Sequence, residues 1–223
     1  MVPEIARELE QLGFPGLRTL PVTVVDGAKA VSGFDVPALK EALNIAAEAP
    51  RWLTAPELLE KYRIFFEGAK RAVLQIPDEK LDWVTPENQR RRQTLRQLAF
   101  HLFDRPDVCM DAAMIETYTR EMCHEYEHLA NNYRTSRDLV NYADAIFWKL
   151  EKFLTHKPDL TETVVETYFG PKTVCILLNM ALVGTGLRIK QTYYFLRVNG
   201  IEPQNAMRDE DFAGVAVPRK IFG

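Results

Sequence analysis

The stretch that decides the fold is KTVCILLNMALVGTGLRIKQTYYFLRV, residues 172–198. It contains no proline, and apolar residues such as Leu177 and Phe195 recur on one of its faces at helical spacing. Asn199 and Gly200, which follow it directly, are residues that commonly end a helix. The stretch therefore predicts one long helix with a buried face.

Three further amphipathic helices are expected upstream, each with a broad apolar face. The connections after the second and third of the four helices are the longer ones. This arrangement predicts a mainly α protein built as a four-helix bundle. The first is expected from the capping box Thr54–Glu57 up to Pro77. The second is expected from about Glu87, and Pro106 kinks or ends it. The third is expected from Thr135 or Ser136 through Phe153.

Residues 1–48 follow a different pattern and are expected to form a small separate unit, with the bundle and its C-terminal tail at 52–223. Their order is helix, strand, strand, helix, and the Asp26-Gly27 pair between the two strands is a strong hairpin signal. The four elements are expected over Ile5–Leu12, Thr19–Val25, Ala28–Ser32 and, after Asp35 as N-cap, up to Leu43.

The 223 residues are 47% hydrophobic and 26% charged, with a net charge of −3. This weak negative charge argues against a nucleic-acid or anionic-membrane partner. The run Arg90-Arg91-Arg92 has no interleaved aromatic residues or glycine-rich loop, and it is interpreted as a solvated helix face. No apolar run reaches the roughly 18 residues of a membrane span.

The cysteines and the N-terminus predict a cytoplasmic protein. Cys109, Cys123 and Cys175 are odd in number and stand far apart, which is typical of a reducing compartment. The first residues, MVPEIARELEQ, are acidic and amphipathic and do not read as a signal peptide.

One literal metal motif occurs, H-E-x-x-H at His124–His128. On a helix its two imidazoles would share a face and could bind zinc, with Glu125 as general base. The motif falls in the connection between the second and third expected helices, and no third ligand follows at a familiar spacing. It is interpreted as a solvent-facing, partly helical connection.

Polar residues also interrupt the apolar faces of two expected helices. His101 flanks the stripe of the second helix, with Asp104 on the same side. On the last helix Gly184, Arg188 and Gln191 share a face with apolar residues. Two interpretations stay open. In one, His101 is a hydrogen-bonded packing residue and Arg188 is paired inside the protein, because a buried arginine requires a partner. In the other, these residues form a small polar site.

Longer segments resemble the DinB/YfiT-like family: LRQLAFHLFDRP at 95–106, SRDLVNYADAIFWKLEKF at 136–153, and TYFGPKTVCILLN at 167–179 followed by the C-terminal residues. The resemblance covers most of residues 52–223. It implies a four-helix bundle that is often dimeric and in which many members bind a divalent metal through three histidines. Some members are similar to thiol-dependent S-transferases or isomerases that use glutathione, mycothiol or bacillithiol.

Residues 1–45 are similar to the C-terminal half of a glutaredoxin. The matching pieces are TLPV with Leu20 and Pro21, the hairpin, and the Gly33-Phe34-Asp35 turn. The resemblance implies that Pro21 is the cis proline of that family and that Gly33 and Asp35 meet the γ-glutamyl end of glutathione. Glutaredoxin-like segments fused to DinB-like bundles form a recognisable group that this chain resembles.

The chain departs from both families at their functional positions. The first metal histidine of the DinB-like family falls on His101, whereas the second and third fall on Gly184 and Arg188. A single imidazole holds a divalent ion poorly and a guanidinium repels one, so no metal is expected. The N-terminal segment lacks the redox cysteines, so no thiol–disulfide exchange is expected there.

Three functions follow as hypotheses. In the first, a metal-free site binds a small anionic or thiol-containing molecule, with Arg188 holding the anion, Gln191 and Asp104 orienting it, Gly184 making room and His101 transferring protons. In the second, the chain is an interaction module, a homodimer or partner-binding protein, in which Arg188 forms an internal ion pair. The third, a glutathione-dependent transferase or isomerase, needs a substitute metal triad such as His101 with His124 and His128.

Overall fold

The computed structural model describes residues 7, 10, 22–32, 36–45, 51–86, 92–218 and 221. Over these residues the protein is mainly helical, as predicted, with a two-stranded sheet near the N-terminus. The chain divides into two compact units, residues 1–51 with 166–171, and residues 52–165 with 172–223. Each unit is described by itself.

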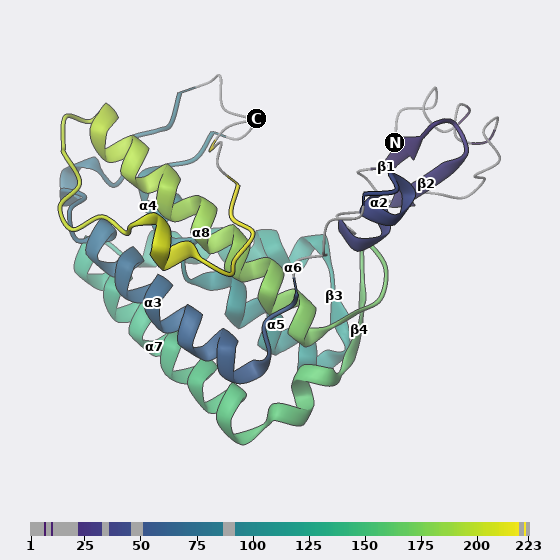
Figure 1. Ribbon diagram of the computed structural model, residues 1–223. Helices are drawn as coiled ribbons and strands as arrows, with labels where there is room; N and C mark the ends of the chain where they lie inside the picture. Colours follow the sequence, from purple (N-terminus) through teal and green to yellow (C-terminus); the bar gives the residue numbers. More distant parts are fainter. Residues whose placement is uncertain are drawn as a thin grey trace. The chain divides into compact units, whose positions relative to one another are not determined.

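The N-terminal unit contains the predicted hairpin (Figure 1). Strand β1 (Val22–Val25) pairs antiparallel with β2 (Lys29–Ser32), and the turn residues Asp26 and Gly27 both have positive φ angles, 50° and 65°. Two successive positive φ angles match the right-handed twist of a tight hairpin, which explains the Asp-Gly pair. Helix α2 (Val36–Ala42) follows, and a small core forms from Val25, Val31, Leu39 and Ala42. The helix expected over Ile5–Leu12 lies outside the described residues, apart from two positions.

The helical unit contains the remaining elements in a simple order. Its α-helices are α3 (Ala55–Val73), α4 (Leu95–Phe100), α5 (Asp104–Ile115), α6 (Arg120–Glu125), α7 (Ser136–His156) and α8 (Val174–Val198). Short 3-10 turns lie at Asp78–Lys80, Tyr126–Asn132, Pro158–Glu162 and Asp209–Phe212. A small sheet has the order β3 (Thr117–Tyr118), β4 (Val164–Thr167) and β5 (Lys172–Thr173).

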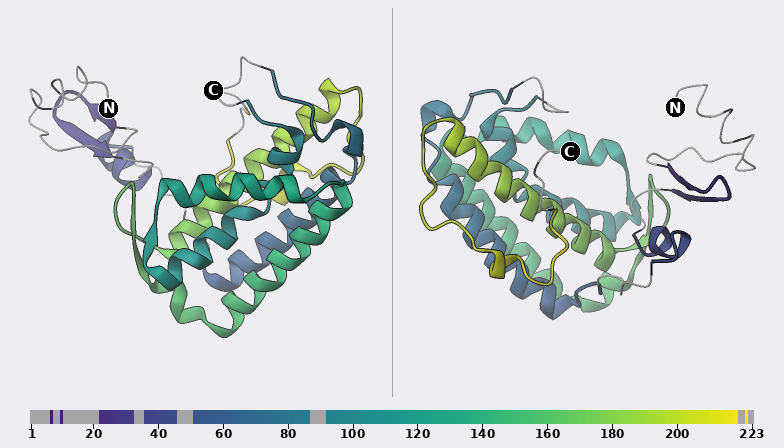
Figure 2. Two further views of the ribbon diagram at one scale, coloured as in Figure 1. Left: turned by 180° about the vertical axis from the view of Figure 1, so that it is seen from behind. Right: turned by 45° about the horizontal axis from the view of Figure 1, so that its top comes forward.

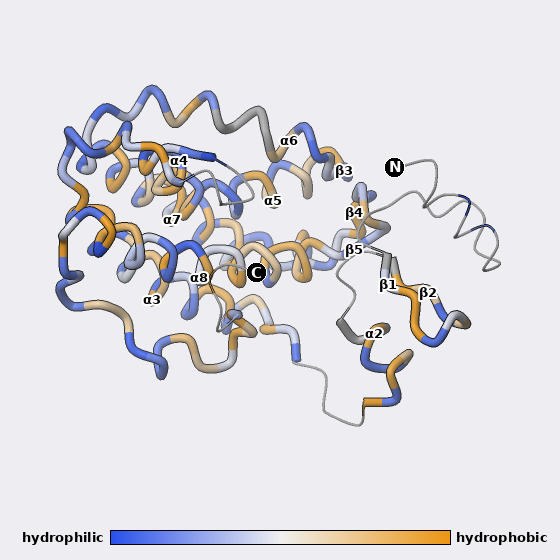
Figure 3. Tube along the Cα trace, turned by 90° about the horizontal axis from the view of Figure 1, so that it is seen from above, coloured by the Kyte–Doolittle hydropathy of each residue, from blue (hydrophilic) through white to orange (hydrophobic). Residues whose placement is uncertain are grey.

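Four helices form the core of this unit. Helix α3 packs on α7 and α8, and α5 packs on the same two helices (Figures 1 and 2). Figure 3 shows hydrophobic and hydrophilic residues alternating along α3 and α7, as amphipathic helices require. Side chains such as Phe65, Phe66, Phe103 and Phe195 are almost completely buried between the four helices. The buried hydroxyl of Tyr62 donates to the Leu178 carbonyl at 2.7 Å, which ties α3 to α8.

Capping residues set the starts of the helices as predicted. The Glu57 carboxylate accepts from the Thr54 backbone amide at 2.9 Å before α3, and Asp138 does the same for Thr135 at 2.9 Å before α7. Helix α8 begins two residues after the expected Lys172, because Lys172 and Thr173 pair with β4. Asn199 is its C-cap.

The second predicted helix is wrong as a single helix. The chain forms α4, which is capped by Thr94 and ends at Phe100, and then turns and restarts as α5 at Asp104. Pro106 therefore lies in the first turn of α5, where its missing N–H costs nothing, and it does not end a helix. The break places His101 in the turn between two helices.

Helix α8 is long and apolar enough to cross a membrane by length and composition, although the sequence was expected to contain no such run. This helix contains two charged residues near its middle, Arg188 and Lys190. Half of its apolar stretch is buried inside the protein, as in the core helix of a soluble protein. One helix of this kind is weak evidence of a membrane span.

The C-terminal segment packs along the outside of the four-helix core, as expected. Met207 lies over Gly68 of α3, and Val217 lies over Gly186 of α8. A β-carbon at either glycine would come within 2.5 Å of these side chains, so both positions require close approach. Lys190 donates to the Pro218 carbonyl at 3.1 Å and fixes the end of the segment.

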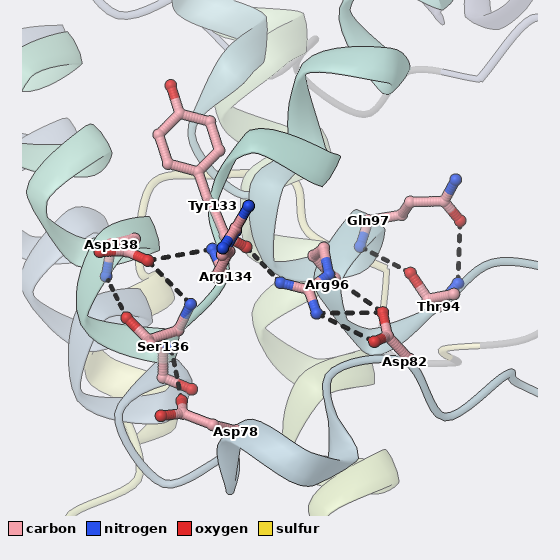
Figure 4. A network of polar contacts seen from close by, with 10 residues as sticks. Asp78, Asp82, Thr94, Arg96, Gln97, Tyr133, Arg134, Ser136 and Asp138 are labelled. Atoms are coloured by element: carbon pink, nitrogen blue, oxygen red, sulfur yellow. Dashed lines mark hydrogen bonds and ion pairs between the residues drawn. The ribbon is translucent and has the colours of Figure 1, made fainter.

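An arginine also ties the loop after α3 to the start of α7 (Figure 4). Arg96 donates to the two carboxylate oxygens of Asp82 at 3.0 and 3.1 Å, and its third nitrogen donates to the Tyr133 carbonyl. Asp78 accepts from the Ser136 backbone amide at 2.7 Å beside it. This network holds the loop after α3, helix α4 and the start of α7 together.

Candidate functional site

The turn between α4 and α5 places two predicted site residues together. His101 is the C-cap of α4, and Asp104 is the first residue of α5, three positions later. His101 is 2% exposed and Asp104 is not exposed at all. His101 Nδ1 lies 2.7 Å from Asp104 Oδ2, so the two side chains form a buried dyad.

The dyad fixes the protonation of the imidazole. A carboxylate can only accept, so the hydrogen on Nδ1 must belong to His101 and be donated to Asp104. The basic nitrogen of the neutral ring is then Nε2, the tautomer found in carboxylate–histidine pairs of catalytic and metal sites. The pair thus orients His101 as a proton acceptor.

The charges around the dyad keep the carboxylate ionised and the imidazole neutral. Burial lowers the pKa of His101 most, and the nearby guanidinium groups of Arg188 and Arg105 lower it further, against the raising effect of Asp104. Burial would raise the pKa of Asp104, but the hydrogen bond from His101 and the charges of Arg105 and Arg188 outweigh burial and lower it. A buried anion is stabilised in this way only where cations converge on it.

Arg188 lies beside Gly184, one turn earlier on α8. A β-carbon at Gly184 would come within 2.9 Å of Arg188 Nη1, so the guanidinium occupies the space that a side chain at 184 would take. Arg188 is half-buried and acts electrostatically on both members of the dyad. The structure therefore brings Gly184, Arg188, His101 and Asp104 into one cluster.

Arg105 is a member of this cluster that the sequence reasoning missed. Its Nε lies 3.6 Å from Asp104 Oδ1, and its side chain is 11% exposed. Two buried atoms, Arg105 Nη1 and Asp104 Oδ1, form no hydrogen bond with any part of the chain that the structure describes. In the sequence Arg105 directly follows Asp104, and both residues lie in the first turn of α5. This pair was missed because one continuous helix was expected from about Glu87, so no helix start was expected at Asp104.

The far side of Arg105 faces a group of weak acids. Burial raises the pKa values of Tyr118 on β3 and Cys109 on α5, and Cys123 on α6 hydrogen-bonds to Tyr118. Arg105 acts electrostatically on all three. Since the raised pKa values of Tyr118 and Cys109 keep these two groups neutral, they do not neutralise the charge of Arg105.

Gln191, predicted to orient a ligand with Arg188, lies three residues beyond it on α8. Its amide donates to the Ile221 carbonyl at 3.2 Å, so it also holds the C-terminal segment. Its role toward a ligand stays a prediction.

The H-E-x-x-H string spans the end of α6 and the beginning of a 3-10 turn, Tyr126–Asn132. Its side chains from His124 to Glu127 lie outside the described residues, and His128 is exposed. The part of the chain that the structure describes contains no group of three side chains suited to a metal ion. The four thiol-binding positions of the glutaredoxin-like segment, Leu20, Pro21, Gly33 and Asp35, also lie outside the described residues.

Comparison with known proteins gives no match, because no protein-family model, no curated protein and no solved structure is detectably similar to this chain. Function is therefore argued mainly from the geometry of the cluster.

Proposed function

We propose that this chain binds a small anionic molecule, which includes thiol-containing peptides with free carboxylates, at the cluster of His101, Asp104, Arg105 and Arg188. The proposal needs no metal. The resemblance to the DinB/YfiT-like family supports the location, because its metal positions fall on His101, Gly184 and Arg188.

The observation that carries the proposal is the buried Nη1 of Arg105, which has no hydrogen-bond partner among the described residues. An unsatisfied buried donor on a charged group costs free energy, about 1–3 kcal/mol or more. Such a cost is commonly retained where a ligand supplies the missing acceptor. A carboxylate or phosphate oxygen matches a guanidinium donor best, because the hydrogen bond is then charge-assisted.

The dyad gives the site acid–base capability. His101 is neutral at physiological pH, since its pKa lies below its usual value, and Asp104 holds the proton on Nδ1. An acidic group of a ligand placed at Nε2 would donate its proton to His101, whose imidazole is hydrogen-bonded to the Asp104 carboxylate. Proton transfer to or from a bound thiol or acid is the chemistry that this arrangement favours.

The test is calorimetric titration with three probes: inorganic phosphate, succinate and glutathione. Wild type is compared with Arg188→Gln, Arg105→Gln and a control, Lys190→Gln, which alters a cation on the same helix that instead donates to the C-terminal segment. Loss of one charge-assisted hydrogen bond should weaken binding about tenfold or more.

The expected result is that at least one probe binds wild type, that both cluster variants weaken it and that the control does not. If none of the probes binds, or if Lys190→Gln weakens binding as much as Arg188→Gln, the proposal fails. A glutathione preference over succinate would favour the thiol-dependent transferase or isomerase chemistry of the resembled family.

A second candidate is an interaction module whose cluster serves only the fold. The observation that favours it is the complete burial of Asp104 beside Arg188, which is what an internal ion pair would produce. Sedimentation analysis distinguishes the two, because this candidate expects a stable homodimer or partner complex that persists in Arg188→Gln. The metal-dependent alternative is tested by elemental analysis of the purified protein.

A further inference from the structure

Helices α5 and α7 leave a hollow between them on the surface of the helical unit. Its volume is about 430 Å³, within the range of small-molecule sites. Met110 and Phe153 form its buried floor, 6% and 7% exposed. Met114 and Trp148 also line it and are 64% and 61% exposed, the two highest exposed fractions among the large hydrophobic side chains of the described residues.

The side chains follow two ridges of α7 and one of α5. Trp148, Lys152 and His156 are four residues apart, as are Lys149, Phe153 and Lys157, and Met110 pairs with Met114 on α5 in the same way. Side chains at this spacing lie one above the other along a helix. From Trp148 to Lys157 the hollow follows α7 for about 13 Å, at 1.5 Å per residue.

The rim of the hollow carries three lysines, Lys149, Lys152 and Lys157, against one carboxylate, Asp111, although the whole chain carries a net charge of −3. Lys149 is already paired, since it donates to Asp107. Lys152 and Lys157 form no ion pair with any residue in the described ranges, and both are exposed. The negative end of α7 accounts for a cation at its C-cap, Lys157, but not for Lys152, which lies more than a turn earlier.

We propose that this hollow binds an amphipathic carboxylate, a molecule with an alkyl or aromatic body and one anionic end. The body lies on Met110 and Phe153 beneath Trp148, and the carboxylate meets Lys152 and Lys157. Methionine and tryptophan suit this task, because a flexible thioether adapts to varied shapes and an indole covers a large apolar area. None of the residues that line the hollow belongs to the His101 cluster.

The test compares two amphiphiles of equal chain length and opposite charge, dodecanoate and dodecyltrimethylammonium, both titrated below their micelle concentrations. Wild type should bind dodecanoate about tenfold more tightly than the cation, because two unpaired lysines favour the anion. Lys152→Glu/Lys157→Glu should reverse that preference. Arg197→Glu/Arg208→Glu changes the net charge equally at exposed positions away from the hollow and should leave the preference as in wild type.

The position is tested with 12-bromododecanoate, whose bromine quenches indole fluorescence at short range. Quenching should be strong in wild type and nearly absent in Trp148→Phe, which retains Trp52 and Trp83. Equal affinity for the two amphiphiles, or quenching that survives in Trp148→Phe, would overturn the proposal. A wild-type dimer that dissociates in Trp148→Ala would assign this face to a second copy of the chain instead.

Discussion

Two arginine networks in the helical unit differ in how completely they are satisfied. Arg96 uses all three of its nitrogens, two on Asp82 and one on the Tyr133 carbonyl (Figure 4). Arg105 approaches Asp104 only to 3.6 Å and leaves its buried Nη1 without a hydrogen-bond partner among the described residues. Both guanidinium groups are largely buried, so burial alone does not separate them.

The difference separates a structural arginine from a candidate binding arginine. A guanidinium whose three nitrogens all donate to the chain holds parts of the chain together, and only two of its five N–H groups are left for another acceptor. An unsaturated one in a preorganised surrounding costs stability in the free protein and recovers it when an anion arrives. Substitutions at the first network should therefore change stability alone, whereas those at the second should change stability and binding in different proportions.

Removing the carboxylate that both cluster arginines face should have the largest effect. Asp104→Ala leaves Arg105 and Arg188 near each other without the buried anion between them, and breaking a buried ion pair on one side costs roughly 3–5 kcal/mol. The free energy of unfolding from urea titration measures the loss. Asp82→Ala is the matched control in the saturated network, and it should cost much less because that carboxylate is 78% exposed.

If Asp104→Ala and Asp82→Ala lower the free energy of unfolding equally, the ion pairs of Asp104 contribute no more to stability than the ion pair of the exposed Asp82. Asp104→Asn refines the comparison, since the amide keeps the volume and can still accept from His101 while losing the charge.

Arg96→Met should have the next largest effect. The variant keeps most of the apolar stem but removes the donor to the Tyr133 carbonyl and the two bonds to Asp82. The expected loss is about 1–3 kcal/mol, mostly from the carbonyl left without its donor. Thermal unfolding measures it, and anion binding at the His101 cluster should stay at the wild-type level. Loss of binding in Arg96→Met would show that the two networks are not independent.

The sequence predicted the helices better than it predicted the cluster, for physical reasons. Helix starts at Ala55 and Ser136 follow from capping residues next to them in the chain. The hairpin turn follows likewise from Asp26-Gly27. The break at His101–Phe103 falls within one turn before Pro106, which has no N–H to donate to the Leu102 carbonyl, whereas the kink or end was expected at Pro106 itself.

Long-range contacts explain what the sequence could not show of the site. Arg188 could be placed near His101 only through the resemblance, since they are far apart in the chain. Arg105 was missed because its role depends on the helix that begins at Asp104. Gln191 was assigned to the site because it shares a helix face with Arg188, and spacing could not reveal that the C-terminal segment reaches its amide.

The pH dependence of stability should reveal the dyad in the unliganded protein. His101 has a folded pKa below its usual 6.5, so the unfolded chain takes up a proton first as the pH falls. The free energy of unfolding should therefore decrease from about pH 6.5 down to the folded pKa of His101, and again below about pH 3.8, where Asp104 is protonated in the unfolded chain.

Urea titrations at about pH 7.5 and about pH 5 measure this decrease. His101→Gln should make the upper step smaller. An upper step of unchanged size in His101→Gln would mean that other groups cause it.

The smallest effect on stability is expected at Gly184, and it tests whether space at that position is needed for Arg188. Gly184→Ala gains up to about 1 kcal/mol of helix propensity. It also displaces the mobile end of Arg188, which lies only 2.9 Å from the new β-carbon. The net change in the free energy of unfolding should stay within about 1 kcal/mol, while anion binding weakens.

Gly186→Ala is the control on the same helix. Its β-carbon would approach Val217 to 2.5 Å and the buried ring of Phe65 to 2.9 Å, so stability should fall while binding is kept. If Gly184→Ala binds anions as well as wild type does, the place of the Arg188 guanidinium beside Gly184 is a packing detail, and Arg105 carries the site without it.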